Sequence, residues 1–470
     1  MYTALVSNLL FPLQERLKRH TTVAVRRRME DSQWWPAERL EALQVRRLRE
    51  LLTQAGARIP YWRELFAGLG FEPSSVTSLQ DLQRLPLLDK ATIRTHTEAM
   101  KHPQAEGLAR FNTGGSSGEP LVFFIGRARV SHDVAAKWRA TRWWGVDIGD
   151  PEIVVWGSPI ELGSQDRLRA LRDRLMRTEL LPAFEMSEAR LDGFVKAIRA
   201  RRPRMLFGYP SALSHIARHA EKRGQRMDDL GIRVAFVTSE RLYDDQRAVI
   251  ARVFGCPVAN GYGGRDAGFI AHECPHGGMH LTAEDVVLEL IDRHGHPVPA
   301  GDPGEIVITH LATHDFPFIR YRTGDVAVMD GRRCPCGRGL PMLGEIQGRS
   351  TDFVVAVDGT VMHGLALIYI LRDLPGLRRF KIVQHSVLHI EVLLEPEPGG
   401  EAVMHIPAVE RGFRARLGEG VRVDVRVVDH IPDERSGKFR YVVSHVAPGG
   451  GAAGGAGLSP KQEASSCATC

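Results

Sequence analysis

The stretch MLFGYPSALSHIARHAEKRGQRMDDLGIRVAFVT, residues 205–238, decides the fold class. Two short apolar runs, Met205–Phe207 and Val234–Thr238, flank the helical pattern Ser211–Arg223. Two buried strands joined by a helix form the unit of parallel α/β sheets. The same alternation extends on both sides, so the sequence predicts an α/β fold. The other elements expected in this part are the strands Glu152–Trp156, Pro257–Asn260 and Val286–Ile291 and the helices Ala189–Arg201 and Asp244–Phe254.

A second pattern begins after residue 348, with shorter strands and two helices near Leu365–Leu374 and Val409–Leu417. We therefore predict a large N-terminal α/β domain (1–348) that starts with a helical segment, including an amphipathic helix over residues 38–54. A smaller, mobile α+β domain (349–446) follows, and then a disordered tail (447–470) rich in Gly, Ala and Ser.

The composition is that of an ordinary globular protein, with 43% hydrophobic and 25% charged residues in a chain of 470. No run approaches 18 uncharged apolar residues, so no membrane-spanning helix is expected. The apolar start Met1–Leu13 is short and is followed, not preceded, by basic residues. Because that order differs from a secretory signal, we expect a cytoplasmic protein.

The formal net charge of +6 comes partly from the arginine-rich stretches 26–28 and 46–49. These stretches are either solvated helix faces or a surface helix that contacts anionic lipid or a membrane-bound partner. A basic field also suits phosphate-rich ligands. The sequence has no interleaving of aromatic and basic residues that would indicate nucleic-acid binding. The sequence also does not determine the oligomeric state.

A glycine- and serine-rich segment, TGGSSGEP (113–120), lies directly before the apolar run Leu121–Ile125. Glycines let the backbone approach phosphates closely, and hydroxyl and N–H groups donate to their oxygens. The alternative is a simple hairpin turn. The segment is not a Walker-type loop, because no Gly-Lys-Ser/Thr follows.

Three further segments combine flexible backbone with charged side chains. NGYGGRD (260–266) follows an apolar run and brings an aromatic ring and a carboxylate together. YRTGD (321–325) ends a strand-like run with an acid that can accept hydrogen bonds from ribose hydroxyls. SGK (436–438) lies in a turn where a lysine can be presented on a mobile loop.

Together these motifs carry a resemblance to a known family. In order, TGGSSGEP, YGGRD (262–266), YRTGD, GRSTD (348–352) and SGK resemble the adenylate-forming superfamily. Within it, the chain is most similar to the phenylacetate–CoA ligase-like branch, which includes members linked to capsule or exopolysaccharide biosynthesis. The N-terminal segments Leu51–Phe66 and Leu85–Lys90 are also similar to that branch. The resemblance covers residues 40–446 and implies an acyl–CoA ligase that uses ATP, Mg²⁺ and CoA to activate a carboxylic acid.

The resemblance also implies roles for individual residues. Lys438 would reach the substrate carboxylate and the α-phosphate, and Asp266 would place Mg²⁺. Asp325 would bind the ribose hydroxyls with Arg349 nearby, and Asp352 would be the hinge between the domains. The β- and γ-phosphates of ATP would lie against Thr113, Gly114, Gly115, Ser116, Ser117 and Gly118, and the adenine and α-phosphate against Ser239, Glu240, Tyr262, Gly263 and Gly264.

The acid itself is expected between Tyr209 and the strand before Tyr262, with Phe207 and Phe236 as an apolar wall. Two residues depart from the superfamily pattern. Glu119 stands where lysine is common, although glutamate also occurs in this branch. Asp266 stands where glutamate is usual, and its shorter side chain changes how Mg²⁺ is placed or adds a bridging water.

Two cysteine- and histidine-bearing segments, CPHGGMH (274–280) and CPCGR (334–338), predict a metal site. Thiolates and imidazoles between Gly and Pro turns suit tetrahedral zinc. The alternative is a set of reduced thiols and unliganded imidazoles. Related sequences of the branch look similar here, and we expect a structural zinc on Cys274, His280, Cys334 and Cys336, with His276 as the alternative imidazole.

Two other functions compete with the acyl–CoA ligase. One keeps adenylation but passes the acyl group to a hydroxyl or amine of a sugar or lipid intermediate, in keeping with the branch's link to polysaccharide synthesis. The other is a non-catalytic, zinc-bearing binding protein. The presence of both Lys438 and Asp325 argues against it. The identity of the acid is not encoded in any of these motifs.

Overall fold

The computed structural model describes most of the chain, and its α/β architecture confirms the predicted fold class. The residues that it describes are 1–112, 121–156, 166–183, 185–292, 294–299, 301–347, 353–372, 374–397, 402–431 and 442–446. Among them, no helix combines the length and the apolar character needed to cross a membrane.

The central feature is a mixed sheet that contains eleven strands within the described part of the chain. Five neighbouring strands run parallel, and from β8 onward each strand pairs antiparallel with the next. In spatial order the strands are β11 (Val286–Ile291), β12 (Gly304–His310), β13 (Tyr321–Asp330), β14 (Met342–Gln347), β10 (Met279–Leu281), β9 (Gly268–Glu273), β8 (Val258–Gly264), β7 (Val234–Thr238), β6 (Met205–Gly208), β3 (Glu152–Trp156) and β4 (Thr178–Pro182).

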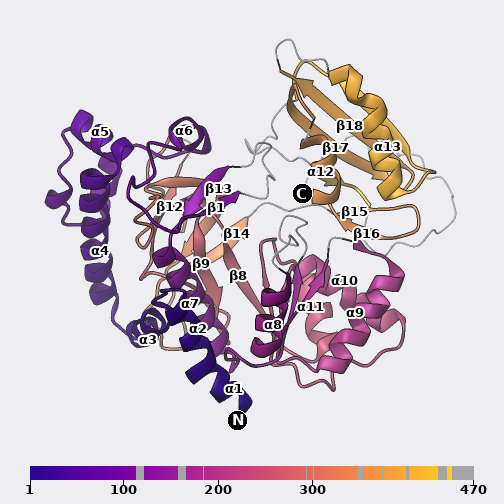
Figure 1. Cartoon of the computed structure of the whole chain (residues 1–470), viewed down its shortest axis with the longest axis horizontal. Helices are drawn as coiled ribbons and strands as arrows, with labels where there is room; N and C mark the ends of the chain where they lie inside the picture. The colour runs from indigo at the N-terminus through magenta and orange to yellow at the C-terminus, as the bar shows by residue number, and fades with distance from the viewer. Residues whose placement is uncertain are drawn as a thin grey trace, which may run out of the picture.

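The parallel half is covered by helices on both faces, as Figure 1 shows. The helices α9 (Glu188–Arg201), α10 (Pro210–Lys222) and α11 (Asp244–Phe254) share a core with one face, and α7 (Arg127–Trp143) packs on the other. Because both faces are buried, β6 is buried along its whole length and β7 along nearly all of it. The helix α11 ends where Gly255 takes a left-handed conformation, as expected for glycine at a helix C-terminus.

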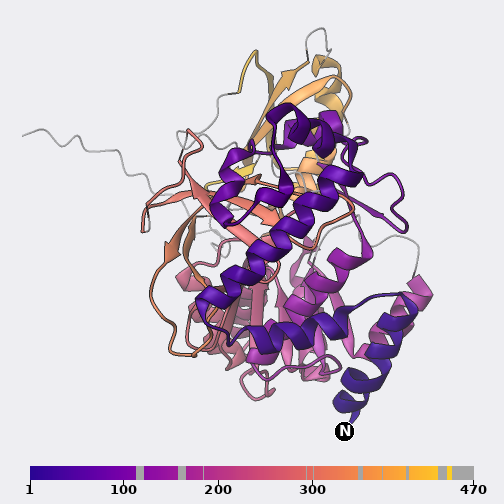
Figure 2. The ribbon, with the colours of Figure 1, turned by 90° about the vertical axis from the view of Figure 1, so that its left-hand side faces the viewer.

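The antiparallel half packs against the N-terminal helices, which Figure 2 shows crossing the molecule. The predicted amphipathic helix is present as α4 (Ala37–Arg58), with Leu40, Leu48, Leu51 and Leu52 buried. The elements of this part are α1 (Tyr2–Leu5), the π-helical turn η1 (Val6–Leu10), α2 (Phe11–Leu17), α3 (Thr22–Ser32), α4, α5 (Pro60–Leu69), the short 3₁₀ turns η2 (Pro73–Ser75) and η3 (Leu79–Arg84), α6 (Lys90–His96) and the hairpin β1 (Ala109–Asn112) and β2 (Val122–Ile125); α8 (Asp166–Met176) precedes β4.

Within its described residues, the C-terminal part has its own core and a four-stranded sheet in the order β19-β18-β17-β20. A second small sheet has the order β15-β16-β5, and β5 (Glu185–Met186) comes from the large N-terminal part. The domain boundary predicted at residues 348 and 349 lies outside the described residues and stays a prediction. The remaining elements are β15 (Phe353–Val355), β16 (Val361–His363), α12 (Leu365–Arg372), β17 (Leu377–Ser386), β18 (His389–Pro396), η5 (Ala402–His405), α13 (Ile406–Leu417), β19 (Arg422–Val427) and β20 (Val442–Ser444).

Candidate functional site

The candidate site lies where the parallel half of the sheet gives way to the antiparallel half. The strand β8 pairs with β7 in parallel and with β9 antiparallel, and its last residues carry Tyr262, Gly263 and Gly264. Ser239 and Glu240 directly follow β7 at the same edge. Ligands of α/β proteins bind at the carboxyl ends of parallel strands, and this edge brings two of the predicted segments together.

A hydrogen bond joins Tyr262 on β8 to Asp325 on β13. The Tyr262 hydroxyl donates to Oδ2 of Asp325 over 2.9 Å. Burial raises the pKa of the Tyr262 phenol well above its usual value, and the Asp325 carboxylate raises it further. The phenol therefore keeps its proton and acts as the donor that fixes the carboxylate.

The backbone around Asp325 is locally irregular. The pairing of β12 with β13 shifts register between Glu305 and Val307, and Gly324 has φ of 78°, which favours glycine. The Thr323 hydroxyl donates to the carbonyl of Ile306 over 2.9 Å and accepts from the Asp325 N–H over 3.1 Å. The sequence pattern predicts that YRTGD ends a strand. This prediction is wrong, because Tyr321 begins β13 and the strand continues to Asp330.

Asp266, in the loop after β8, is held by two hydrogen bonds. Its Oδ2 accepts a 2.6 Å hydrogen bond from the Tyr321 hydroxyl, and its Oδ1 accepts one from the Ala267 N–H over 3.1 Å. Its charge also contributes to the raised pKa of Tyr262. Two carboxylates, Asp266 in the loop between β8 and β9 and Asp325 in β13, thus lie near one phenol.

Arg129 in α7 is a residue that the sequence analysis missed. Its side chain is 1% exposed and donates to the carbonyls of Arg265 (3.3 Å) and Asp266 (3.4 Å from Nη2). It also donates to Thr313 Oγ1 over 3.0 Å and to Asp133 over 2.9 Å. The guanidinium therefore holds the backbone that carries Asp266. A possible signal was the Arg129–Asp133 pair, an opposite-charge pair at helical i,i+4 spacing.

The segment after β7 is tied to the start of α10. The Glu240 carboxylate accepts hydrogen bonds from the hydroxyl and the N–H of Ser211, the second residue of that helix. A carboxylate is stabilised there by the positive end of the helix dipole. Ser239 has φ of 73°, a strained backbone conformation of the kind that clusters at functional sites.

The three residues predicted to line the acyl pocket are all buried. Phe207 and Phe236 stack at 6.0 Å on the face of the sheet that α7 covers. Tyr209 stacks on Trp156, at the end of β3, with ring centroids 4.4 Å apart. The structure thus adds Trp156, which the sequence analysis did not select, as the aromatic neighbour of Tyr209. The pocket assignment itself stays a prediction.

Other predicted site residues lie outside the described part of the chain. The segment 113–120 lies in sequence between β1 and β2, whose ends pair as Asn112 with Val122. This pairing is compatible with both predictions for the segment, a phosphate loop and a hairpin turn, and neither is tested. The residues concerned are Thr113, Gly114, Gly115, Ser116, Ser117, Gly118, Arg349, Asp352 and Lys438.

The C-terminal part approaches this edge through α12. Burial lowers the pKa of the Arg265 guanidinium, and the side chain of Tyr369 in α12 acts in the opposite direction. Arg265 directly precedes Asp266, so a residue of the C-terminal part interacts with the loop that carries a candidate catalytic carboxylate.

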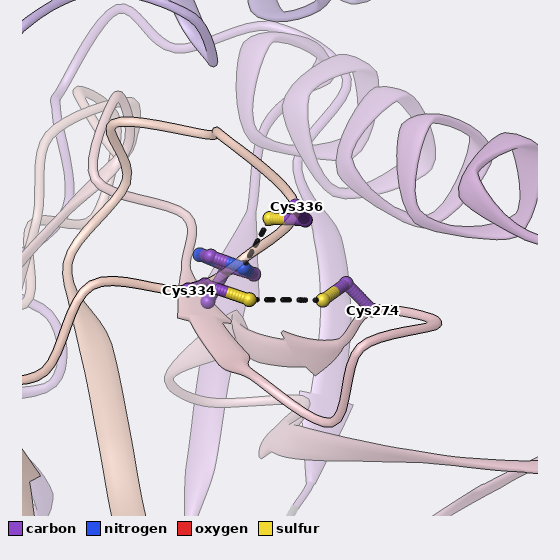
Figure 3. A group of neighbouring side chains, drawn as sticks. Cys274, Cys334 and Cys336 are labelled. Atoms are coloured by element: carbon purple, nitrogen blue, oxygen red, sulfur yellow. Dashed lines mark hydrogen bonds between the residues drawn. The ribbon is translucent and has the colours of Figure 1, made fainter.

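The predicted metal ligands form a compact cluster, shown in Figure 3. The Sγ atoms of Cys274 and Cys334 are 3.5 Å apart, and Cys336 Sγ lies 3.2 Å from Nε2 of His280. All four ligand atoms lie within 4.8 Å of one another. A zinc tetrahedron with ordinary bond lengths has edges of about 3.5 to 3.8 Å, so the donor set fits the ion. His276 is not in this cluster.

The histidine of the cluster is oriented by a second hydrogen bond. Nδ1 of His280 donates to the carbonyl of Leu340 over 3.2 Å, so Nε2 faces the sulfurs with its lone pair. Metal-bound histidines are commonly oriented in this way. The cluster connects the end of β9 and strand β10 with the segment between β13 and β14. The chain thus has a preorganised donor set at the far end of β13 from Asp325.

Two family models match this chain. Residues 181–313 match the AMP-binding enzyme family, and residues 354–445 match the CapK C-terminal domain. The first match contains β8 with Tyr262 and the loop with Asp266, and the second contains most of the described C-terminal elements.

Curated relatives match along most of the chain. A phenylacetate-coenzyme A ligase of Thermus thermophilus is 26% identical over 405 residues, which cover 84% of this chain and 87% of the relative. Protein CapK of Staphylococcus aureus is 22% identical over 414 residues, covering 86% and 89%. A phenylacetate-coenzyme A ligase of Pseudomonas putida is 28% identical over 320 residues, covering 66% and 71%.

Solved structures share the fold. A 2-hydroxyisobutyryl-CoA ligase in complex with 2-HIB-AMP and CoA aligns with a TM-score of 0.63 at 23% identity, covering 88% of this chain and 91% of that one. The same ligase in the postadenylation state with R3-HIB-AMP aligns with a TM-score of 0.59 at 22% identity, covering 88% and 91%.

Proposed function

We propose that this chain, an adenylate-forming protein of the phenylacetate–CoA ligase-like branch, is an AMP-forming acid–thiol ligase. It activates a carboxylic acid with ATP and transfers the acyl group to CoA. The observation that carries the proposal is the approach of Asp325 and Asp266 to Tyr262 at one edge of the sheet. The coenzyme A ligases among its relatives support the reaction class.

In the proposed first step, a carboxylate oxygen of the substrate attacks the α-phosphorus of ATP. The bond between the α-phosphorus and the bridging oxygen breaks, and pyrophosphate leaves. The chain contributes position and charge: Asp325 accepts hydrogen bonds from the ribose hydroxyls, and Lys438 donates to the oxygens of the reacting phosphate.

Mg²⁺ fits this site, because one protein carboxylate together with substrate phosphates is its usual environment. Asp266 would hold the ion, and the bound ion would neutralise charge on the phosphates. Both oxygens of Asp266 already accept hydrogen bonds from the protein, so its orientation is fixed before any ligand arrives.

In the proposed second step, the CoA thiolate attacks the acyl carbon, and the bond to AMP breaks. For this step we propose that residues 349–446 rotate about Asp352, which removes Lys438 from the reaction centre and admits the thiol. The reaction needs ATP and free CoA, so we propose a cytoplasmic enzyme. An apolar acid would lie against Tyr209 and its stacked neighbour Trp156, with Phe207 and Phe236 behind them.

We further propose that Cys274, His280, Cys334 and Cys336 hold a structural zinc. The support is the set of four donor atoms within 4.8 Å and the fixed orientation of His280. The ion would join β9, β10 and the segment before β14, and so stabilise the half of the sheet that contains Asp325.

One observation favours an acyl acceptor other than CoA: residues 354–445 match the CapK C-terminal domain. In this alternative the acyl group passes from AMP to a hydroxyl or amine of a sugar or lipid intermediate. Both versions share the adenylation half-reaction and differ only in the nucleophile of the second step.

The test is a pyrophosphate-release screen over aryl, fatty and hydroxy acids with ATP and Mg²⁺. With a responsive acid, CoA addition should yield a thioester, and acyl-AMP that persists in the presence of CoA would favour the other acceptor. Lys438→Ala should slow pyrophosphate release by about 10²-fold and spare thioester formation from acyl-AMP supplied ready-made. If no acid releases pyrophosphate and ATP does not bind, the chain is a non-catalytic binding protein.

A further inference from the structure

The N-terminal helical segment, residues 2–17, has two faces of different character. Its inner face is anchored: Val6 and Phe11 are buried, and Phe11 packs edge-on against Trp138 with ring centroids 5.1 Å apart. Thr3 donates to Asp150 Oδ1 over 2.9 Å, and the Tyr2 hydroxyl donates to the carbonyl of Leu175 over 2.8 Å. The segment is therefore fixed on the body of the protein.

The opposite face carries a row of exposed leucines. These residues, Leu5, Leu9, Leu13 and Leu17, are 44%, 56%, 53% and 78% exposed. Residues four apart share one face of a helix, so the four side chains form one stripe, here called the leucine row. The segment runs along the outside of the molecule, as Figures 1 and 2 show.

Positive charge gathers at the same end of the chain. Residues 1–28 contain six arginines and lysines and one acid, a net charge of +5 out of +6 for the whole chain. The acid, Glu15, points inward, where it accepts from Thr22 and lies 3.1 Å from His20. Arg16 lies roughly 60° around the helix from Leu13, and it is exposed together with Lys18 and Arg19.

The arginine stretches noted in the sequence do not form this surface by themselves. Arg26 lies over the Trp138 ring at 4.5 Å and pairs with Glu30. Arg47 pairs with the buried Asp285 over 2.8 Å. These two arginines have structural roles. At the end of the leucine row, Lys18 lies 3.8 Å from the Glu15 carboxylate but stays exposed, as do Arg16 and Arg19.

We propose that the leucine row and its basic end bind an anionic lipid surface and hold the protein at a membrane as a peripheral, non-spanning component. An interfacial helix combines an exposed apolar stripe with lysine and arginine at its border. Complete cover of four leucines buries roughly 400 Å², about half of the 800 Å² per partner that a stable protein interface needs. A lipid surface needs no such complementary area, and its negative charge matches the basic end.

The experiment is sedimentation of the full chain with vesicles of phosphatidylcholine alone or mixed with phosphatidylglycerol, at low and high salt. The wild-type protein should bind the mixed vesicles, more tightly at low salt, and bind the neutral vesicles weakly. Leu9→Ser with Leu13→Ser should weaken binding at least about tenfold, and Arg16→Gln, Lys18→Gln and Arg19→Gln together should do the same. The matched control is Leu69→Ser with Leu388→Ser, two leucines elsewhere that are 49% and 56% exposed, which should bind like wild type.

Equal binding of the wild type and the leucine-row variant, or equal binding to neutral and anionic vesicles, would overturn the proposal. So would a wild-type dimer in analytical ultracentrifugation that the leucine-row variant abolishes, because the row would then be a contact between copies of the chain. Thermal melting checks that each variant is folded. The assay needs no substrate, so its result is independent of the proposed enzymatic function.

Discussion

The hydroxyl of Tyr321 lies 2.6 Å from Oδ2 of Asp266, although the two residues are 55 positions apart in the chain. Tyr321 begins β13, and Asp266 lies in the loop between β8 and β9. The bond therefore links the antiparallel half of the sheet to the loop at its junction with the parallel half. Arg129 supports the same loop from α7 by binding its carbonyls.

Substitution of Arg129 by lysine should impair adenylation specifically. Lysine keeps the charge but cannot reproduce the fork of N–H donors that binds two carbonyls and Thr313. We expect kcat/KM for pyrophosphate release to fall about tenfold, with a higher Mg²⁺ concentration for half-maximal rate. The control is Arg139→Lys, an arginine of the same helix that is also 1% exposed and pairs with Glu284 at 2.6 Å. An equal loss in both variants, with unchanged Mg²⁺ dependence, would assign Arg129 to stability alone.

Removal of the Asp325 carboxylate should weaken nucleotide binding. Asp325→Ala loses the acceptor proposed for the ribose hydroxyls, and we expect ATP affinity to fall at least about tenfold in calorimetry. Tyr262→Phe removes the phenol that orients this carboxylate and should have a smaller effect. Asp330→Ala, at the far end of the same strand, serves as the control. An unchanged affinity of the Asp325 variant would reject the ribose assignment.

The cysteine cluster should carry metal. Protein purified without chelator should contain about one zinc per chain, as expected for a single four-ligand site. Cys334→Ser combined with Cys336→Ser should lower both the zinc content and the Tm, because binding to the folded form alone adds to stability. Cys256→Ser, at a buried cysteine outside the cluster, should leave the zinc content unchanged. If the wild-type protein contains no metal, the four residues are ordinary side chains without a ligand role.

Acidification should destabilise the protein partly through His215 in α10. Burial, together with the charges of His219 and Arg218, lowers the pKa of His215 to about 4, and Glu188 opposes the shift. The unfolded state therefore binds the proton more tightly than the folded state between pH 6.5 and 4, and stability is lost as pH falls through that window. Between pH 7 and pH 5 the loss is about 2 kcal/mol at most.

The measurement is urea unfolding of the wild type and His215→Gln at both pH values. The variant should show the smaller loss of unfolding free energy, and His296→Gln, whose side chain is 78% exposed, should behave like wild type. Identical pH dependence in all three proteins would show that His215 does not contribute.

The sequence predicted best where local signals agreed with the tertiary environment. The helix Asp244–Phe254 was predicted with its observed bounds, because an acidic first turn and the terminal Gly255 mark its two ends. The cysteine and histidine donors were also predicted, from their residue types and from the family resemblance, and the structure brings all four together.

The strand β8 shows why other features were missed. It was expected to end at Asn260, since Gly261, Gly263 and Gly264 resemble a loop. Pairing with β9 instead extends it to Gly264. Gly263 has no room for a side chain, because a Cβ there would collide with the Gly268 carbonyl. The partner strand, and not the intrinsic preference of the glycines, decides this conformation.

The role of Arg129 was hidden for a related reason. Its partners, the carbonyls of Arg265 and Asp266, come from a loop more than a hundred residues away. Side-chain types and spacing within α7 carry no information about that distant backbone. Trp156 likewise became notable only when β3 and β6 were placed side by side and its ring met Tyr209.

In the described part of the chain, strand β5 consists of two residues and pairs with β16, as Met186 with Val361 and Glu185 with Met362. If the C-terminal part rotates during each catalytic cycle, this pairing has to open, and each opening uncovers the edge of a strand. Exposed strand edges are the usual starting points for aggregation, and proteins limit that risk by keeping such strands very short. The brevity of β5 is therefore suited to a contact that forms and breaks repeatedly: it is long enough to align the two parts, but too short to recruit a strand from another molecule while it is open.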